Sequence, residues 1–125
     1  MKLDFDQQVT FLTTSKMSES IEFYENILEL ELVLDQGGCR IYRVSNDAFL
    51  GICEREKHVD GCNHLVFTFV TDKVDEWYEK IKGKNVEITK TPAFNPEYNI
   101  YHMFFLDPNG YLMEIQEFKD PNWPK

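Results

Sequence analysis

The sequence is poor in basic residues, and this deficit limits the partners that the protein can have. Its 125 residues include 13 Lys and Arg against 22 Asp and Glu, which gives a formal net charge of −9. No cluster of Lys and Arg interrupts this acidic balance, so the chain lacks the positive patch that holds a nucleic-acid backbone or anionic lipids. We therefore expect no nucleic-acid partner and no membrane partner.

Long apolar runs and paired cysteine motifs are also missing. The longest apolar stretch, Ala48 to Cys53, is far shorter than the roughly 20 residues of a membrane-spanning helix, and the first residues carry no signal-peptide core. The three cysteines, Cys39, Cys53 and Cys62, are odd in number and form no C-x-x-C pair. We expect a cytoplasmic protein whose cysteines are reduced thiols.

Apolar residues recur with two periods, and the order of these periods repeats along the chain. Alternation predicts strands over 8–14, 31–35, 39–44 and 48–53, and a 3.6-residue period predicts a helix over 18–28. The same order returns with strands over 64–70, 86–89, 100–106 and 111–118 and a helix that begins near 74 and ends at Gly83. Each half is therefore predicted to be a βαβββ module.

The repeat sets the expected domain organisation. Module 1 covers about 5–54 and module 2 about 63–118, with a polar linker at 55–62 and a tail at 119–125. Neither module has enough sheet to bury a face alone, so the two should pack about an approximate twofold axis. This predicts one α+β domain, a curved mixed sheet around a cleft with the helices outside.

The repeat also brings polar residues to corresponding places. Aligning the halves sets Gln8 against His64 and Gly51 against Glu114, and alternation turns His64 and Glu114 away from the apolar face. Gln8, His64 and Glu114 could hold a divalent metal with positions left open for substrate. His64 and Glu114 could equally be a structural pair, and His102 could serve as acid, base or ligand if its side of the strand faces the cleft.

Three segments resemble a known family. They are Gln8-Val9-Thr10-Phe11 leading to Ser20-Ile21-Glu22-Phe23-Tyr24 and Leu28, then Asn63-His64-Leu65-Val66-Phe67, and finally Asp107-Pro108-Asn109-Gly110-Tyr111-Leu112-Met113-Glu114-Ile115. Over about 7–118 the chain resembles the vicinal oxygen chelate superfamily, which includes glyoxalase I, bleomycin-resistance proteins and extradiol dioxygenases.

The resemblance implies a function and a set of ligands. Ligands in glyoxalase-like members come from the positions of Gln8, Gly51, His64 and Glu114, and Gly51 has no side chain to offer. A glyoxalase-like lyase or isomerase would use Gln8, His64 and Glu114 to hold Ni, Zn, Mn or Fe, and would act on a small molecule with vicinal oxygens. Its catalytic candidates are Glu114 and His102. The alternative is a metal-free, bleomycin-resistance-like protein that binds a small molecule or antibiotic, and a homodimer is expected in either case.

Overall fold

The computed structural model describes residues 3–56 and 64–124, which form two compact units, Met1–Asp60 and Gly61–Lys125. Each unit has its own four-stranded mixed sheet. The two are described separately below.

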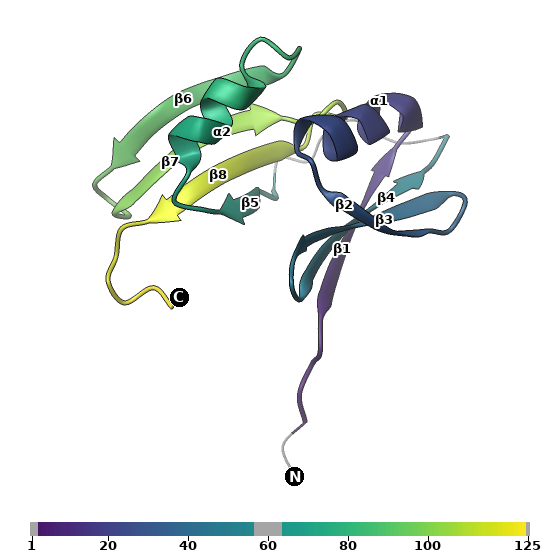
Figure 1. Cartoon of the computed structure of the whole chain (residues 1–125), viewed down its shortest axis with the longest axis horizontal. Coiled ribbons are helices and arrows are strands. Elements are labelled where there is room, and N and C mark those ends of the chain that lie inside the picture. Colours follow the sequence, from purple (N-terminus) through teal and green to yellow (C-terminus); the bar gives the residue numbers. More distant parts are fainter. Residues whose placement is uncertain (1–2, 57–63, 125) are drawn as a thin grey trace. The chain divides into compact units, whose positions relative to one another are not determined.

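The N-terminal unit has one helical segment and four strands (Figure 1). In chain order they are β1 (Gln8–Thr14), α1 (Met17–Ile21), a π-helical turn η1 (Glu22–Ile27), β2 (Glu31–Asp35), β3 (Cys39–Ser45) and β4 (Ala48–Glu54). The sheet has the order β1-β4-β3-β2, with β1 parallel to β4 and the other pairs antiparallel.

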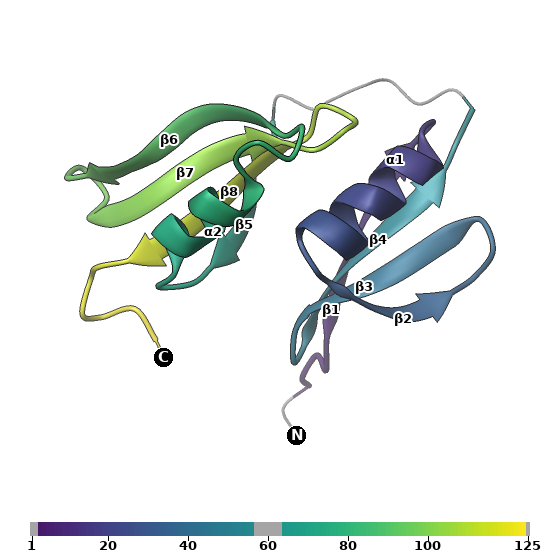
Figure 2. The same cartoon turned by 45° about the horizontal axis from the view of Figure 1, so that its top comes forward.

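The C-terminal unit repeats this arrangement (Figure 2). Its elements are β5 (Phe67–Val70), α2 (Val74–Ile81), β6 (Glu87–Asn95), β7 (Ile100–Leu106) and β8 (Leu112–Phe118). The sheet order is β5-β8-β7-β6, with β5 parallel to β8. The prediction of an α+β fold made of two βαβββ modules is confirmed.

The first helix differs from the sequence prediction in its start and in its last turns. It begins at Met17, one residue before the predicted start, and its N-cap residue is Lys16, with no side-chain cap. The N–H of Lys16 instead donates to Thr14 Oγ1 at 2.8 Å. The N–H of Leu28 reaches back five residues to the carbonyl of Phe23, so the helix ends as a π-helical turn.

One face of the second sheet forms the core of the C-terminal unit. Helix α2 packs on β6, β7 and β8, and Met103, Phe105, Met113 and Ile115 are almost fully buried. Gly83, at φ +81°, ends the helix as predicted. Because side chains alternate along a strand, the residues between these core positions project from the opposite face of the sheet.

The structure corrects the prediction for two of the three cysteines. Cys39 and Cys53 lie directly opposite each other on β3 and β4, with Cα atoms 4.1 Å apart, and form a disulfide. The sequence did not show the register that brings them together. Cys62, like most of the predicted linker 55–62, lies outside the described residues.

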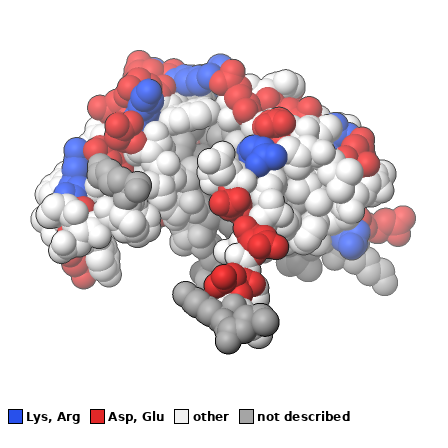
Figure 3. All heavy atoms as spheres, turned by 60° about the horizontal axis from the view of Figure 1, so that its bottom comes forward, with Lys and Arg blue, Asp and Glu red and all other residues white. Residues whose placement is uncertain are grey.

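The charge distribution and the helix lengths bear on the expected partners. On the face drawn in Figure 3, Lys and Arg are scattered among more numerous Asp and Glu. Within the described ranges, no helix has the length and apolar character needed to cross a bilayer.

Candidate functional site

Glu114 lies near the middle of β8, on the sheet face that points away from α2. It is 7% exposed, and three donors surround its carboxylate. Thr68 Oγ1, from the neighbouring strand β5, donates to Oε1 at 2.7 Å. The side-chain amide of Gln116 is oriented so that its NH₂ group, rather than its oxygen, faces the carboxylate, and it donates to Oε2 at 2.7 Å. The third donor is His102 on β7, whose Nδ1 lies 2.6 Å from Oε2.

The contact with Glu114 fixes the hydrogen-bonding role of His102. Since a carboxylate only accepts, Nδ1 carries the proton, and in the neutral ring Nε2 is then an acceptor. His102 is 4% exposed, and its Nε2 is buried without a hydrogen-bond partner in the part of the chain that the structure describes. A buried acceptor without a partner typically costs about 1–3 kcal/mol. A bound molecule can satisfy this acceptor once the side chains that cover Nε2 move aside, because the atom itself is buried.

A pocket of about 660 Å³ lies over this pair. We call it the tail pocket, because its wall includes the segment that follows β8. All its lining residues belong to the C-terminal unit, and they include four aromatic side chains and two acidic ones. They are Lys90, Asn95, Tyr98, Ile100, His102, Phe104, Glu114, Gln116, Phe118, Asp120, Asn122 and Trp123.

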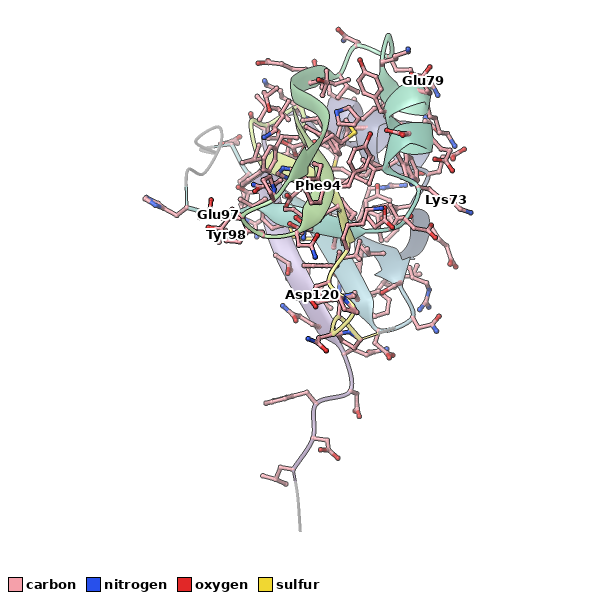
Figure 4. The ribbon with its side chains drawn as sticks, turned by 90° about the vertical axis from the view of Figure 1, so that its left-hand side faces the viewer. Lys73, Glu79, Phe94, Glu97, Tyr98 and Asp120 are labelled. Carbon is pink, nitrogen blue, oxygen red and sulfur yellow. A yellow bond between two sulfur atoms is a disulfide. The ribbon has the colours of Figure 1, made fainter. Side chains whose placement is uncertain are left out.

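The tail is held in place by its own contacts. The N–H of Lys119 donates to the carbonyl of Asn99 at 3.0 Å, and the N–H of Trp123 donates to the carbonyl of Asp120 at 3.1 Å. The ring of Trp123 stacks on Phe118 with centroids 3.7 Å apart. Figure 4 labels Tyr98 on the β6–β7 turn and Asp120 on the tail, at the end of the unit where β8 finishes.

The predicted ligand His64 is not beside Glu114 in this unit. Residue Thr68 pairs with Glu114 in the register of β5 and β8, and His64 precedes Thr68 by four residues, about 13 Å of extended chain. His64 is exposed, and β5 begins at Phe67 rather than at residue 64. Across 3–56 and 64–124, no group of three His, Cys, Asp or Glu side chains is placed to hold a metal.

The other two predicted positions lie in the N-terminal unit. Gln8 is the exposed first residue of β1 and pairs with Ala48. Gly51 pairs with Phe11, and a Cβ atom on Gly51 would lie 2.4 Å from Cδ1 of the Phe11 ring. Phe11 thus occupies the space that a larger residue at position 51 would need.

In the described part of the C-terminal unit, the polar atoms of Glu114 and His102 are directed at protein partners and do not converge on a common point. Glu114 directs both carboxylate oxygens at protein donors, and His102 turns Nδ1 toward Glu114 rather than toward a shared third point. A joint role for Gln8, His64 and Glu114 stays a prediction.

Sequence reasoning missed several parts of this site. Thr68 lies on the same strand face as Glu114 by alternation, so the pairing of β5 with β8 would have identified it. Gln116 shares the face of Glu114 two residues later. From the sequence, Tyr98, Tyr101 and Trp123 could either line a ligand pocket or fill an edge or dimer contact, and the structure places Tyr98 and Trp123 in the pocket lining.

A βαβββ repeat with a carboxylate on the last strand of the second module defines the class of glyoxalase-like proteins. Residues 7–115 match the model of the Glyoxalase/Bleomycin resistance protein/Dioxygenase superfamily, and the chain belongs to this family. The resemblance to the superfamily is confirmed.

Individual relatives agree with this assignment. The chain is 27% identical over 111 residues to the metallothiol transferase FosB of Staphylococcus saprophyticus, covering 82% of this chain and 70% of that protein. Among solved structures, a glyoxalase/bleomycin resistance protein/dioxygenase from Nocardioides superposes with a TM-score of 0.75 at 17% identity, covering 100% of this chain and 90% of the other. Lactoylglutathione lyase from Agrobacterium tumefaciens gives 0.72 at 19% identity, with 93% and 96% covered.

Proposed function

We propose that this protein binds a small organic molecule in the tail pocket, and that Nε2 of His102 accepts a hydrogen bond from it without a metal. The observation that supports the proposal is the buried Nε2 atom, which has no partner within the described ranges and belongs to a pocket-lining side chain. A ligand O–H or N–H would satisfy this acceptor and remove the cost of burying it unpaired.

The surroundings of Glu114 suit this role. Thr68 and Gln116 hold the carboxylate from two sides, and the carboxylate in turn orients the imidazole. A ligand donor would meet the imidazole at Nε2, the ring nitrogen that Glu114 does not contact. Glu114 would then be a positioning residue, and His102 would be the group that meets the ligand.

The test is a ligand screen by shift in melting temperature, carried out in EDTA, followed by calorimetry on the hits. Replacing His102 by Ala should weaken binding by about two- to tenfold, because one neutral hydrogen bond is lost. The matched control is His64→Ala, which removes an exposed imidazole outside the tail pocket and should bind as the wild type does. Hits that bind His102→Ala equally well would contradict the proposal.

A metal-dependent enzyme of the lyase or isomerase type is the second candidate. It is supported by the likeness to a metallothiol transferase and by the place of Glu114 after the Asp107-Pro108-Asn109-Gly110 turn. Gln8, His64 and Glu114 would hold the ion, which would polarise an oxygen of a substrate with vicinal oxygens. Metal analysis of protein purified without chelator tests it: about one ion per chain, lost in His64→Ala, would favour the enzyme.

Two further expectations stay predictions. A homodimer is expected from the family resemblance, and sedimentation velocity would measure the mass in solution. A cytoplasmic location is expected from the composition, and fractionation of the producing cells would check it.

A further inference from the structure

Part of the tail pocket lies outside the segment that defines the family. The family model ends at residue 115, whereas Phe118, Asp120, Asn122 and Trp123 all follow that point and all line the pocket. The tail therefore forms one wall of the pocket, and this wall is suited to determine which ligand the pocket takes.

Two aromatic side chains that line the tail pocket keep accessible ring surface. Trp123 has one ring face on Phe118, at an interplanar angle of 13°, and remains 40% exposed. Tyr98, on the β6–β7 turn, lines the same pocket and is 66% exposed. Flat rings stack favourably on such surfaces in offset or edge-on geometry.

The tail is ordered well enough to hold Trp123 in place. The backbone N–H of Lys119 donates a hydrogen bond to the carbonyl of Asn99. The side chain of Asp120 accepts a hydrogen bond from the backbone N–H of Asn122 at 2.9 Å. The backbone N–H of Trp123 also donates to the carbonyl of Asp120. The indole is thus presented on a fixed turn, which reduces the entropy that a ligand must overcome to stack on it.

We infer that the tail pocket takes a molecule with a flat aromatic ring and an O–H or N–H donor, the ring stacking on Trp123. This inference rests on the proposed function for the donor, which meets His102. The ring contact is independent of it, because it concerns a different wall of the pocket.

The test compares two primary alcohols with the same carbon skeleton and the same aliphatic O–H donor. 2-Naphthalenemethanol has a flat ring system, and decahydro-2-naphthalenemethanol does not. Calorimetry on the wild type should give tighter binding of 2-naphthalenemethanol by about two- to tenfold, the range expected for one aromatic pair. Trp123→Leu should abolish this preference, and Trp123→Tyr should keep it.

A second readout locates the ring. The chain has two tryptophans, and Trp77 lies on α2 away from the pocket lining. In Trp77→Phe protein the single indole N–H signal in the ¹H–¹⁵N spectrum belongs to Trp123. It should shift with 2-naphthalenemethanol through the ring current and shift much less with the saturated alcohol.

The outcomes separate this inference from the proposed function. Equal affinity for the two alcohols, a preference that survives in Trp123→Leu, or no binding of 2-naphthalenemethanol would overturn the aromatic slot. His102→Gln should weaken both alcohols alike and leave the preference intact. If His102→Gln binds both as the wild type does while Trp123→Leu loses the preference, the slot stands and the role of His102 fails.

Discussion

Replacing Gly51 by Ala should reveal a tight contact between β1 and β4. An ideal Cβ on Gly51 would lie 2.4 Å from Cδ1 and 2.6 Å from Cε1 of Phe11, well inside van der Waals contact. Gly51 is buried, and Phe11 is 54% exposed. The added methyl group cannot move, so the Phe11 ring has to turn away about χ1.

The magnitude follows from two opposing effects. Overpacking typically costs about 1–3 kcal/mol, and the half-exposed ring should place this cost near the middle of the range, about 2 kcal/mol. Replacing Gly by Ala within a strand raises the free energy of unfolding by about 0.5–1 kcal/mol, because Ala loses less backbone entropy on folding. We expect Gly51→Ala to lower the free energy of unfolding by about 1 kcal/mol in the wild type and to raise it by about 0.5–1 kcal/mol in Phe11→Ala.

Urea unfolding of the four proteins, followed by far-UV circular dichroism, measures this double-mutant cycle. The expected coupling between positions 11 and 51 is about 2 kcal/mol. An equal effect of Gly51→Ala in both backgrounds would refute the reasoning, because it would mean that Phe11 does not occupy the space beside Gly51. The same logic predicts that a carboxylate at position 51 is tolerated best after Phe11→Ala.

Three further predictions concern other parts of the molecule. Burial, and next the hydrogen bond to Glu25, raises the pKa of Tyr42 to about 12. This contribution to the free energy of unfolding is fully present below the unfolded pKa near 10, and about 2–3 kcal/mol is lost as the pH rises from about 10 to 12. Urea unfolding of Tyr42→Phe should show a smaller loss of stability over this alkaline range. Reduction of the Cys39–Cys53 disulfide, which has a sequence separation of 14, should lower the free energy of unfolding by about 3 kcal/mol. Alkylation of the unreduced, denatured chain should modify one of its three cysteines, and modification of all three would contradict the pairing. In Asp107, Oδ1 accepts hydrogen bonds from two backbone N–H groups of the β7–β8 turn. Asp107→Ala removes this acceptor and should lower the free energy of unfolding in urea by about 2–4 kcal/mol, whereas Asp107→Asn should retain part of this stability.

Local patterns predicted the fold well, because each module is built from short-range signals. Alternation located the strands at 8–14, 31–35 and 100–106 to the residue, and the Asp107-Pro108-Asn109-Gly110 turn joined the last two strands as expected. The errors fall where strand pairing decides the outcome. The disulfide between Cys39 and Cys53 depends on the register of β3 with β4, which no local pattern encodes.

The site was predictable in its carboxylate and not in its partners. Glu114 emerged from the turn motif and the repeat, but His102 depended on which way β7 faces. The register settles this: His102 is opposite Gln116, one step diagonally from Glu114, so both side chains share a face. His64 was chosen from its place in the repeat, yet β5 starts at Phe67, and Thr68 takes the place beside the carboxylate.

The neighbours of Glu114 bear on which proposal the site favours. A carboxylate that binds a metal needs an oxygen lone pair free to face the ion, with other donors converging on the same point. In the C-terminal unit, Thr68, His102 and Gln116 all direct donors at this carboxylate, and a metal would have to displace at least one of them. The same three contacts instead orient His102, whose Nε2 lies buried and unpaired in the described structure. The hydrogen-bond partners of Glu114 thus come from its own sheet and hold His102 in place, and this is the physical reason to seek the ligand of this protein at His102.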